Sequence, residues 1–200
     1  MEQIATRGRP REFNVDEALT KALYLFWSKG YEGTSLTDLT DAMGITRPSL
    51  YAAFGNKEQL FRHALDLYER EKMAYVGRAL EQPTARAVAK WLLEGALATC
   101  TGEAQPPGCL SVISSTACGS EAECIRVEVT KRGMIVHEAV VARMQRAIDE
   151  GDFTVPVKAE AIAKYLSAVV QGIAIQAGTG SSRQELEGVV EQTLAVWPGR

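Results

Sequence analysis

The stretch of residues 33 to 54, GTSLTDLTDAMGITRPSLYAAF, constrains the fold of this chain most, because it encodes two short helices joined by a tight turn. Ser35 and Asp38 have the spacing of a capping box, in which each side chain bonds the other residue's backbone N–H, so a helix starts here. Gly44 ends that helix, and Thr46 caps the next one. The pattern predicts a helix-turn-helix, although an αα-hairpin of an ordinary core would carry the same signals.

The second helix of this pair presents a candidate DNA-reading surface. It starts near Arg47, and its Leu50 and Phe54 lie four residues apart, which gives it a narrow apolar stripe toward the first helix. A helix-turn-helix places its second helix in the DNA major groove, where an arginine can pair with guanine or phosphate. The residues that we expect to face outward are Arg47, Ser49, Tyr51 and Ala53.

The run from Phe13 to Tyr68 resembles the N-terminal domain of the TetR family of transcriptional regulators. The motifs that carry the resemblance are Gly30-Tyr31, Gly33-Thr34-Ser35, Leu50-Tyr51 and Phe54-Gly55-Asn56-Lys57-Glu58. The resemblance implies an all-helical regulator that binds double-stranded operator DNA as a homodimer. It also implies DNA contacts at Thr34, Thr37, Thr46, Arg47, Ser49, Tyr51 and Lys57.

Residues 1–11 are expected to form a flexible, basic arm ahead of this domain. Arg7, Arg9 and Arg11 cluster in a stretch that Gly and Pro interrupt and that is too short and polar to fold. Such an arm can follow phosphates or enter a minor groove. A solvated tail without a DNA role is the alternative.

Composition predicts a globular protein of the cytoplasm. Of the 200 residues, 46% are hydrophobic and 24% are charged, which suits a chain with a sizeable core. No apolar run approaches the roughly 20 residues of a membrane span, and the N-terminus lacks an apolar signal core. The four cysteines form no C-x-x-C pair and lie apart from the two histidines, so we expect no metal, no other cofactor and no disulfide.

Helical spacing and cap signals continue to the end of the chain and predict an all-α fold of about nine helices. Asn14 with Glu17 caps a first helix that covers the helix-turn-helix, and Asn56 opens a fourth helix that runs to about Leu80. This fourth helix links a DNA-binding domain over residues 12–68 to an effector-binding and dimerisation domain over residues 69–200. The later helices are expected over 85–100, over 109–117, from a Ser120 and Glu123 cap to about Glu150, over 157–177, and from a Ser182 and Glu185 cap to the C-terminus.

The last two of these helices carry more apolar residues than a single core needs. Their apolar positions wrap past one stripe, so we expect them to pair with a second copy of the chain in a four-helix interface. The predicted interface residues are Ile162, Leu166, Val169, Val170, Ile173, Leu186, Val190, Leu194 and Trp197.

The inner helices of the second domain suggest an effector site. Helical bodies bind small molecules between helices, in apolar pockets with a few polar groups, so we expect a hydrophobic or aromatic effector. The candidate residues are Trp91, Cys109, Met134, His137, Tyr165 and Gln171. Each of them is equally compatible with an ordinary core position.

Cys109 offers an alternative way of sensing. It follows Pro106-Pro107-Gly108 at a predicted helix start, where the helix dipole favours a thiolate. Cys100 and Cys118 could serve as resolving partners, so a repressor that senses oxidants or electrophiles through Cys109 is one alternative. A small buried hydrophobe is the other.

These features favour a ligand-responsive repressor whose dimer presents two reading helices about 34 Å apart to a palindromic operator. An enzyme would need a nucleophile with a base, paired carboxylates or a phosphate-binding glycine loop, and the chain has none of these patterns, so no catalytic residue is predicted. A helical small-molecule carrier without a DNA role is the remaining alternative, although it leaves the basic arm and Arg47 unexplained.

Overall fold

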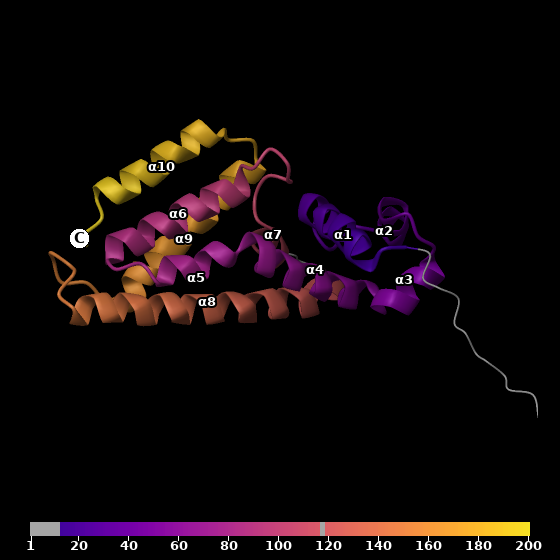
Figure 1. Ribbon diagram of the computed structural model, residues 1–200, viewed down its shortest axis with the longest axis horizontal. Helices are drawn as coiled ribbons and strands as arrows, with labels where there is room; N and C mark the ends of the chain where they lie inside the picture. Colours follow the sequence, from indigo (N-terminus) through magenta and orange to yellow (C-terminus); the bar gives the residue numbers. More distant parts are fainter. Residues whose placement is uncertain (1–12, 117–118) are drawn as a thin grey trace, which may run out of the picture.

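A computed structural model describes residues 13–116 and 119–200, which fold into ten α-helices and one short 3₁₀ helix (Figure 1). The helices are α1 (Val15–Lys29), α2 (Leu36–Met43), α3 (Arg47–Phe54), α4 (Lys57–Lys72), α5 (Ala74–Leu80), α6 (Ala85–Cys100), α7 (Leu110–Ser115), η1 (Ser120–Ala122), α8 (Glu123–Asp149), α9 (Ala159–Gly178) and α10 (Arg183–Ala195). The all-α prediction is confirmed, with one α-helix more than the nine expected.

The first four helices form a compact head at one end of the molecule (Figure 1). The predicted capping box of Ser35 and Asp38 is present, and Gly44 ends α2 in the left-handed conformation. Thr46 caps α3 by accepting from the backbone N–H of Ser49 at 3.3 Å. The local signals therefore set the boundaries of both helices of the helix-turn-helix, as expected.

The predicted fourth helix is broken, which corrects the continuous helix expected to Leu80. Met73 leaves the helical conformation between α4 and α5, and the hydroxyl of Thr99 on α6 donates to the freed carbonyl of Lys72 at 3.2 Å. The break lets α4 pack on α1 while α5 packs on α6. Because neither Gly nor Pro stands at this point, the sequence carried no local signal for it.

The start of the long seventh helix also differs from the prediction. Ser120 does not cap it; residues Ser120–Ala122 form the 3₁₀ turn η1, and α8 follows without a side-chain cap. The carboxylate of Glu32 in the head accepts from the backbone N–H of Gly119 at 2.9 Å, just before this turn. A contact distant in sequence therefore takes the place of the local cap.

The body consists of α5, α6, α9 and α10, with α8 running along one side of the molecule and reaching the head (Figure 1). Two hydrophobic clusters fill the interior, one in the body and one in the head. The head cluster also takes side chains from α7, η1 and α8, namely Leu110, Ala122, Ile125 and Val129. The domain border predicted near residue 68 is thus bridged by shared core packing.

The turn before α7 joins the head to α9. The buried indole of Trp27 donates to the carbonyl of Gly108 at 3.1 Å. Gly108 has a φ of +86°, and a Cβ there would lie 3.1 Å from the carbonyl of Ala174 on α9, so glycine suits this position for both reasons. Among the helices described, none combines the length and the hydropathy of a membrane span.

Candidate nucleic-acid interface and effector cavity

The α3 helix presents an exposed polar face at the end of the head. Arg47 lies at its start, and its guanidinium donates to the hydroxyl of Thr37 on α2 at 2.8 Å. Two residues predicted to contact DNA therefore lie together, and the bond orients the charged group without neutralising it. Tyr51, one turn further along α3, is 48% exposed.

The same face holds a second pair of hydroxyls. Thr46 and Ser49 lie 3.0 Å apart, hydroxyl to hydroxyl, with Thr46 exposed and Ser49 half-buried. Ala53 differs from the expectation that it faces outward: it is half-buried and packs against the head cluster. In the last turn of α3, Ala53 and Phe54 therefore lie toward the head, whereas Tyr51 and Ala52 are exposed.

Two further residues predicted to contact DNA, Thr34 and Lys57, differ in their exposure. Thr34 is fully buried, and its hydroxyl donates to the carbonyl of Gly30 at 2.7 Å. This corrects its predicted role as a DNA contact, because its hydroxyl is buried and bonded inside the head. Thr34 stabilises the turn before α2 instead. The ammonium of Lys57 lies 4.3 Å from the centre of the Tyr31 ring, a cation–π contact beside the start of α4. Arg7, Arg9 and Arg11 lie outside the described residues.

An ion pair fixes the helix in front of the reading helix. Lys29 on α1 contacts Asp38 on α2 at 2.8 Å. This bond, followed by those from Ser35, holds the pKa of Asp38 well below its usual range. The first-turn carboxylate of α2 is therefore committed to the head and stays charged.

A cavity of about 390 Å³ lies where the head meets the body. Most of its wall is apolar and comes from α4, α5, α8 and α9, including Leu65, Met73, Val76 and Val140. The polar lining residues comprise Glu69, Ser111, Arg132, His137, Ser167 and Gln171. An adjoining pocket shares several of these residues and adds Met134 and Lys164.

Three of the six predicted effector residues lie at these two openings. His137 and Gln171 line both, and Met134 lines the adjoining pocket. The other three lie elsewhere: Trp91 borders a groove of α5 and α6, Tyr165 borders a groove of α9 and α10, and Cys109 packs between the two cores. Helical spacing identified inner helices but not which side of each helix faces the cavity.

A network of six charged residues, which no local sequence pattern predicts as a whole, links α4 to α8 beside this cavity. The bonds join Arg62 to Glu58 (2.9 Å) and Glu128 (2.7 Å), and Arg132 to Asp66 (2.6 Å), Glu69 (2.9 Å) and Glu128 (2.8 Å). The four-residue spacing of Glu58 with Arg62, and of Glu128 with Arg132, was visible in the sequence. The links across helices were not.

The network shifts the ionisation of its members. Hydrogen bonds from Arg132, and then from Arg62, lower the pKa of Glu128 despite its partial burial. Burial opposes the charged form of Arg132, but its bonds to three carboxylates outweigh this and raise its pKa. Both charges therefore persist at neutral pH.

Comparison with known proteins agrees with the geometry of the head. Residues 18–64 match the family model described as bacterial regulatory proteins, tetR family. The whole chain is similar to the HTH-type transcriptional repressor ComR of Escherichia coli, with 33% identity over 96% of this chain and 93% of that protein. The chain belongs to the TetR family.

Two further relatives extend the comparison of this TetR family regulator. The HTH-type transcriptional repressor BdcR of Escherichia coli is 28% identical over 92% of this chain and 89% of that protein. The solved structure of a cysteine mutant of CifR, a TetR family transcriptional regulator complexed with 26 bp double-strand operator DNA, is 38% identical, with a TM-score of 0.89 over 96% of this chain and 100% of that chain. The chain described here is therefore a DNA-binding transcriptional regulator, like the other members of its family, rather than an enzyme.

Six of the nine predicted dimer residues are buried inside the regulator's own body. Ile162, Leu166, Ile173, Leu186, Val190 and Trp197 are buried in its core, and Val169, Val170 and Leu194 pack against that core. The burial of the first six corrects the expectation that they face a partner, whereas the three half-buried residues stay predicted interface positions. The apolar surface that α9 and α10 leave exposed includes Tyr165 (40%), Ile175 (53%) and Val196 (62%).

Cys109 sits at the joint between head and body. The hydroxyl of Tyr68 on α4 lies 3.2 Å from its sulfur, within hydrogen-bonding distance, and burial raises the pKa of Tyr68. Burial, and then the proximity of Cys109, raises the pKa of Cys100 to about 12. Cys118, the other suggested partner, lies outside the described residues.

Proposed function

We propose that this TetR family regulator binds a palindromic operator as a homodimer and releases it when a small, largely apolar effector enters the cavity between α4, α5, α8 and α9. The observation that carries the proposal is the position of α4. It begins directly after the reading helix α3, and two of its residues, Leu65 and Glu69, line the cavity. A ligand that moves this wall moves the reading helix with it.

Operator recognition is assigned to the exposed face of α3. A guanidinium is suited to bidentate contact with guanine in the major groove, and the bond from Arg47 to Thr37 reduces the freedom that Arg47 would lose on binding. Tyr51 adds an aromatic body with a polar tip on the same face. The basic arm of Arg7, Arg9 and Arg11 would add phosphate contacts that do not depend on sequence.

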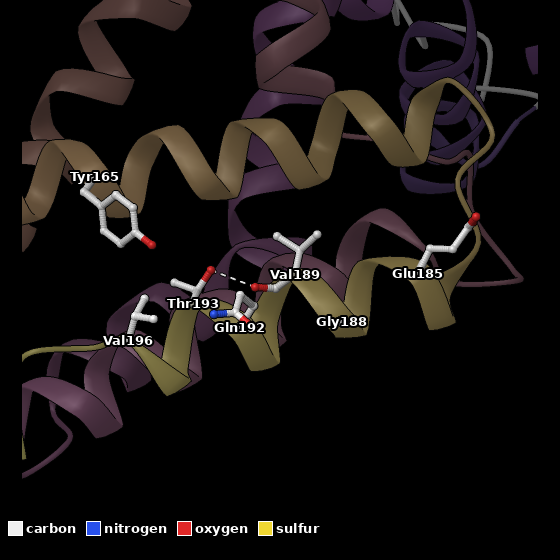
Figure 2. A pocket seen from close by; sticks show the side chains of 7 residues that line it. All are labelled: Tyr165, Glu185, Gly188, Val189, Gln192, Thr193 and Val196. Atoms are coloured by element: carbon white, nitrogen blue, oxygen red, sulfur yellow. Dashed lines mark hydrogen bonds between the residues drawn. The ribbon is translucent and has the colours of Figure 1, made fainter.

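The homodimer is assigned to the outer face of α9 and α10. Figure 2 shows Tyr165 of α9 projecting toward α10 across a groove that Gly188, Gln192 and Val196 border. The exposed side of α9 also carries small residues, Ala161, Ala168 and the half-buried Gly172, which permit close approach of a second helix. A self-complementary face of this kind suits an isologous dimer.

Arg47→Ala tests the DNA-binding part of the proposal. An operator is first selected from random DNA with the wild-type protein and then titrated with both proteins. We expect the variant to lose about 1 to 3 kcal/mol of binding free energy, because a bidentate base contact is lost, with an unchanged melting temperature. Arg146→Ala, an exposed arginine on α8 far along the body, is the control that should leave affinity unchanged. Wild-type affinity of Arg47→Ala would remove α3 from the reading surface.

A second candidate mode of release is covalent modification of Cys109. The observation that favours it is its position between the two cores, with its sulfur beside Tyr68. An adduct on this sulfur would occupy space that the joint between head and body now fills. The same reading helix would then be released without occupation of the cavity.

A further inference from the structure

The wall of the effector cavity distinguishes between ligands of different charge. Its ionisable residues, among those described, are Glu69, Arg132 and His137. His137 bonds Glu160 at 2.8 Å through its Nε2. Glu69 and Arg132 bond each other at 2.9 Å across the gap between α4 and α8.

This ion pair is unequal, because the arginine is shared and the glutamate is not. Arg132 binds three carboxylates: its Nη1 contacts both Asp66 and Glu69, and its Nε contacts Glu128. In the whole α4–α8 network, four carboxylates share two guanidiniums, which leaves two negative charges in excess. Glu69 is the carboxylate of this network that lines the cavity.

A ligand cation and a ligand anion therefore meet different costs. A cation that bonds Glu69 takes one of three carboxylates from Arg132, which keeps Asp66 and Glu128 as partners. An anion would have to compete with all three carboxylates for the guanidinium. Each ligand also lies beside one charge of its own sign in this wall, the cation beside Arg132 and the anion beside Glu69, so the difference comes from this competition. Carboxylates in excess also raise the local concentration of cations near the cavity.

From this exchange we infer that the effector is a hydrophobic organic cation, an apolar body with a protonated amine that bonds Glu69 in place of Arg132. The inference rests on the proposed function, since it gives the chemical class of the effector for that cavity. The exchange would also loosen the contact between two helices, because each bound molecule removes the bond between Glu69 on α4 and Arg132 on α8. Binding energy at the cavity is thereby used to free the helix that leads to α3.

Three probes of nearly equal shape test the inference: 4-phenylbutylamine, 4-phenylbutanol and 4-phenylbutyrate. They share one apolar body and differ in head-group charge. Binding to the full chain is measured by calorimetry, and operator release by fluorescence anisotropy of labelled operator. We expect the amine to bind at least about tenfold more tightly than either of the others, because it alone can form a charged hydrogen bond with Glu69 while Arg132 keeps two carboxylates, and to release the operator at lower concentration.

Glu69→Gln and Asp66→Asn form a matched pair of variants. Both remove the negative charge of a carboxylate paired with Arg132, but Asp66 is absent from the cavity wall. The preference for the amine should fall to about twofold or less in Glu69→Gln and persist in Asp66→Asn. A preference that survives in Glu69→Gln, or is lost equally in Asp66→Asn, overturns the inference.

The probes also separate this inference from the proposed function. Equal binding and equal operator release by the three probes would overturn the inference that the effector is a cation, while supporting the cavity as the effector site. Tighter binding of the butyrate would do the same and reverse the assigned charge. If the amine does not bind the wild-type protein, the inference is overturned, and the operator titration of Arg47→Ala still judges DNA recognition independently.

Discussion

Ile175→Asp is the substitution that most directly tests the proposed dimer face. Ile175 lies on α9 and is 53% exposed in the single chain, so a carboxylate there can stay hydrated in a monomer. In an isologous dimer the change occurs twice. Half of the side chain is already covered in the single chain. We therefore expect the interface to pay about 2 to 3 kcal/mol for burying each carboxylate, less than the several kcal/mol for a fully buried, unpaired carboxylate.

The two copies together destabilise the dimer by about 4 to 6 kcal/mol, which raises its dissociation constant about 10³- to 10⁴-fold. Sedimentation equilibrium over a range of protein concentrations measures this constant, and thermal melting followed by circular dichroism checks the fold. We expect a folded monomer whose operator affinity falls, because a single reading helix contacts only one half-site.

Two controls separate this effect from a general response to charge. Val127→Asp places the same carboxylate at a site on α8 that is 60% exposed, and it should leave both the dimer and the fold unchanged. Ile173→Asp, two residues from Ile175 but fully buried, should unfold the chain instead. If Ile175→Asp sediments with the wild-type dissociation constant, the interface lies on another face.

Three further predictions concern the arm, the ion network and the cysteine. Removing residues 1–11 should weaken binding about equally across DNA sequences and flatten the dependence of log affinity on log salt, and an unchanged slope would assign the arm no phosphate contacts. The lowered pKa of Glu128, caused first by its bond from Arg132, stabilises the fold above its unfolded value of 4.5, and this stabilisation is lost as pH falls through the lower folded value. The free energy of unfolding of wild type, measured in urea from about pH 7 to about pH 3, should therefore approach that of Glu128→Gln on acidification; a constant difference between the two would contradict the shift. N-ethylmaleimide should release the operator from wild type and from Cys124→Ser, whose cysteine is exposed, but not from Cys109→Ser; equal release from all three would leave Cys109 as core packing.

The sequence allowed the head to be predicted because its signals are local. Ser35, Gly44 and Thr46 set helix ends through bonds to backbone groups within a few residues, and those bonds form in the same way whatever surrounds them. The face of α3 follows from the same local information, since Leu50 and Phe54 define its buried side. Thr34 shows the limit of the resemblance: the residue type matches a DNA contact, but its hydroxyl bonds inside the head.

The effector cavity was only partly predictable, because it depends on how helices rotate against one another. His137 and Gln171 were identified from their place on inner helices, and both line the cavity. Trp91 and Tyr165 met the same criterion but face other grooves. Apolar spacing defines a stripe on each helix, whereas a cavity is defined by the stripes of several helices at once.

The sequence by itself determined most of the helices, the caps in the head and the presence of a helix-turn-helix, because backbone hydrogen bonds and side-chain periodicity act over one or two turns. Only the tertiary structure decided where α4 breaks, since the break at Met73 is held by Thr99 from another helix. It likewise decided that the apolar face with Ile173 is covered within one chain, leaving Ile175 outside. It also brought Arg132 to Glu69, which are 63 residues apart. Contacts of this kind depend on which surfaces meet after the chain has folded back on itself, and no local pattern records that choice.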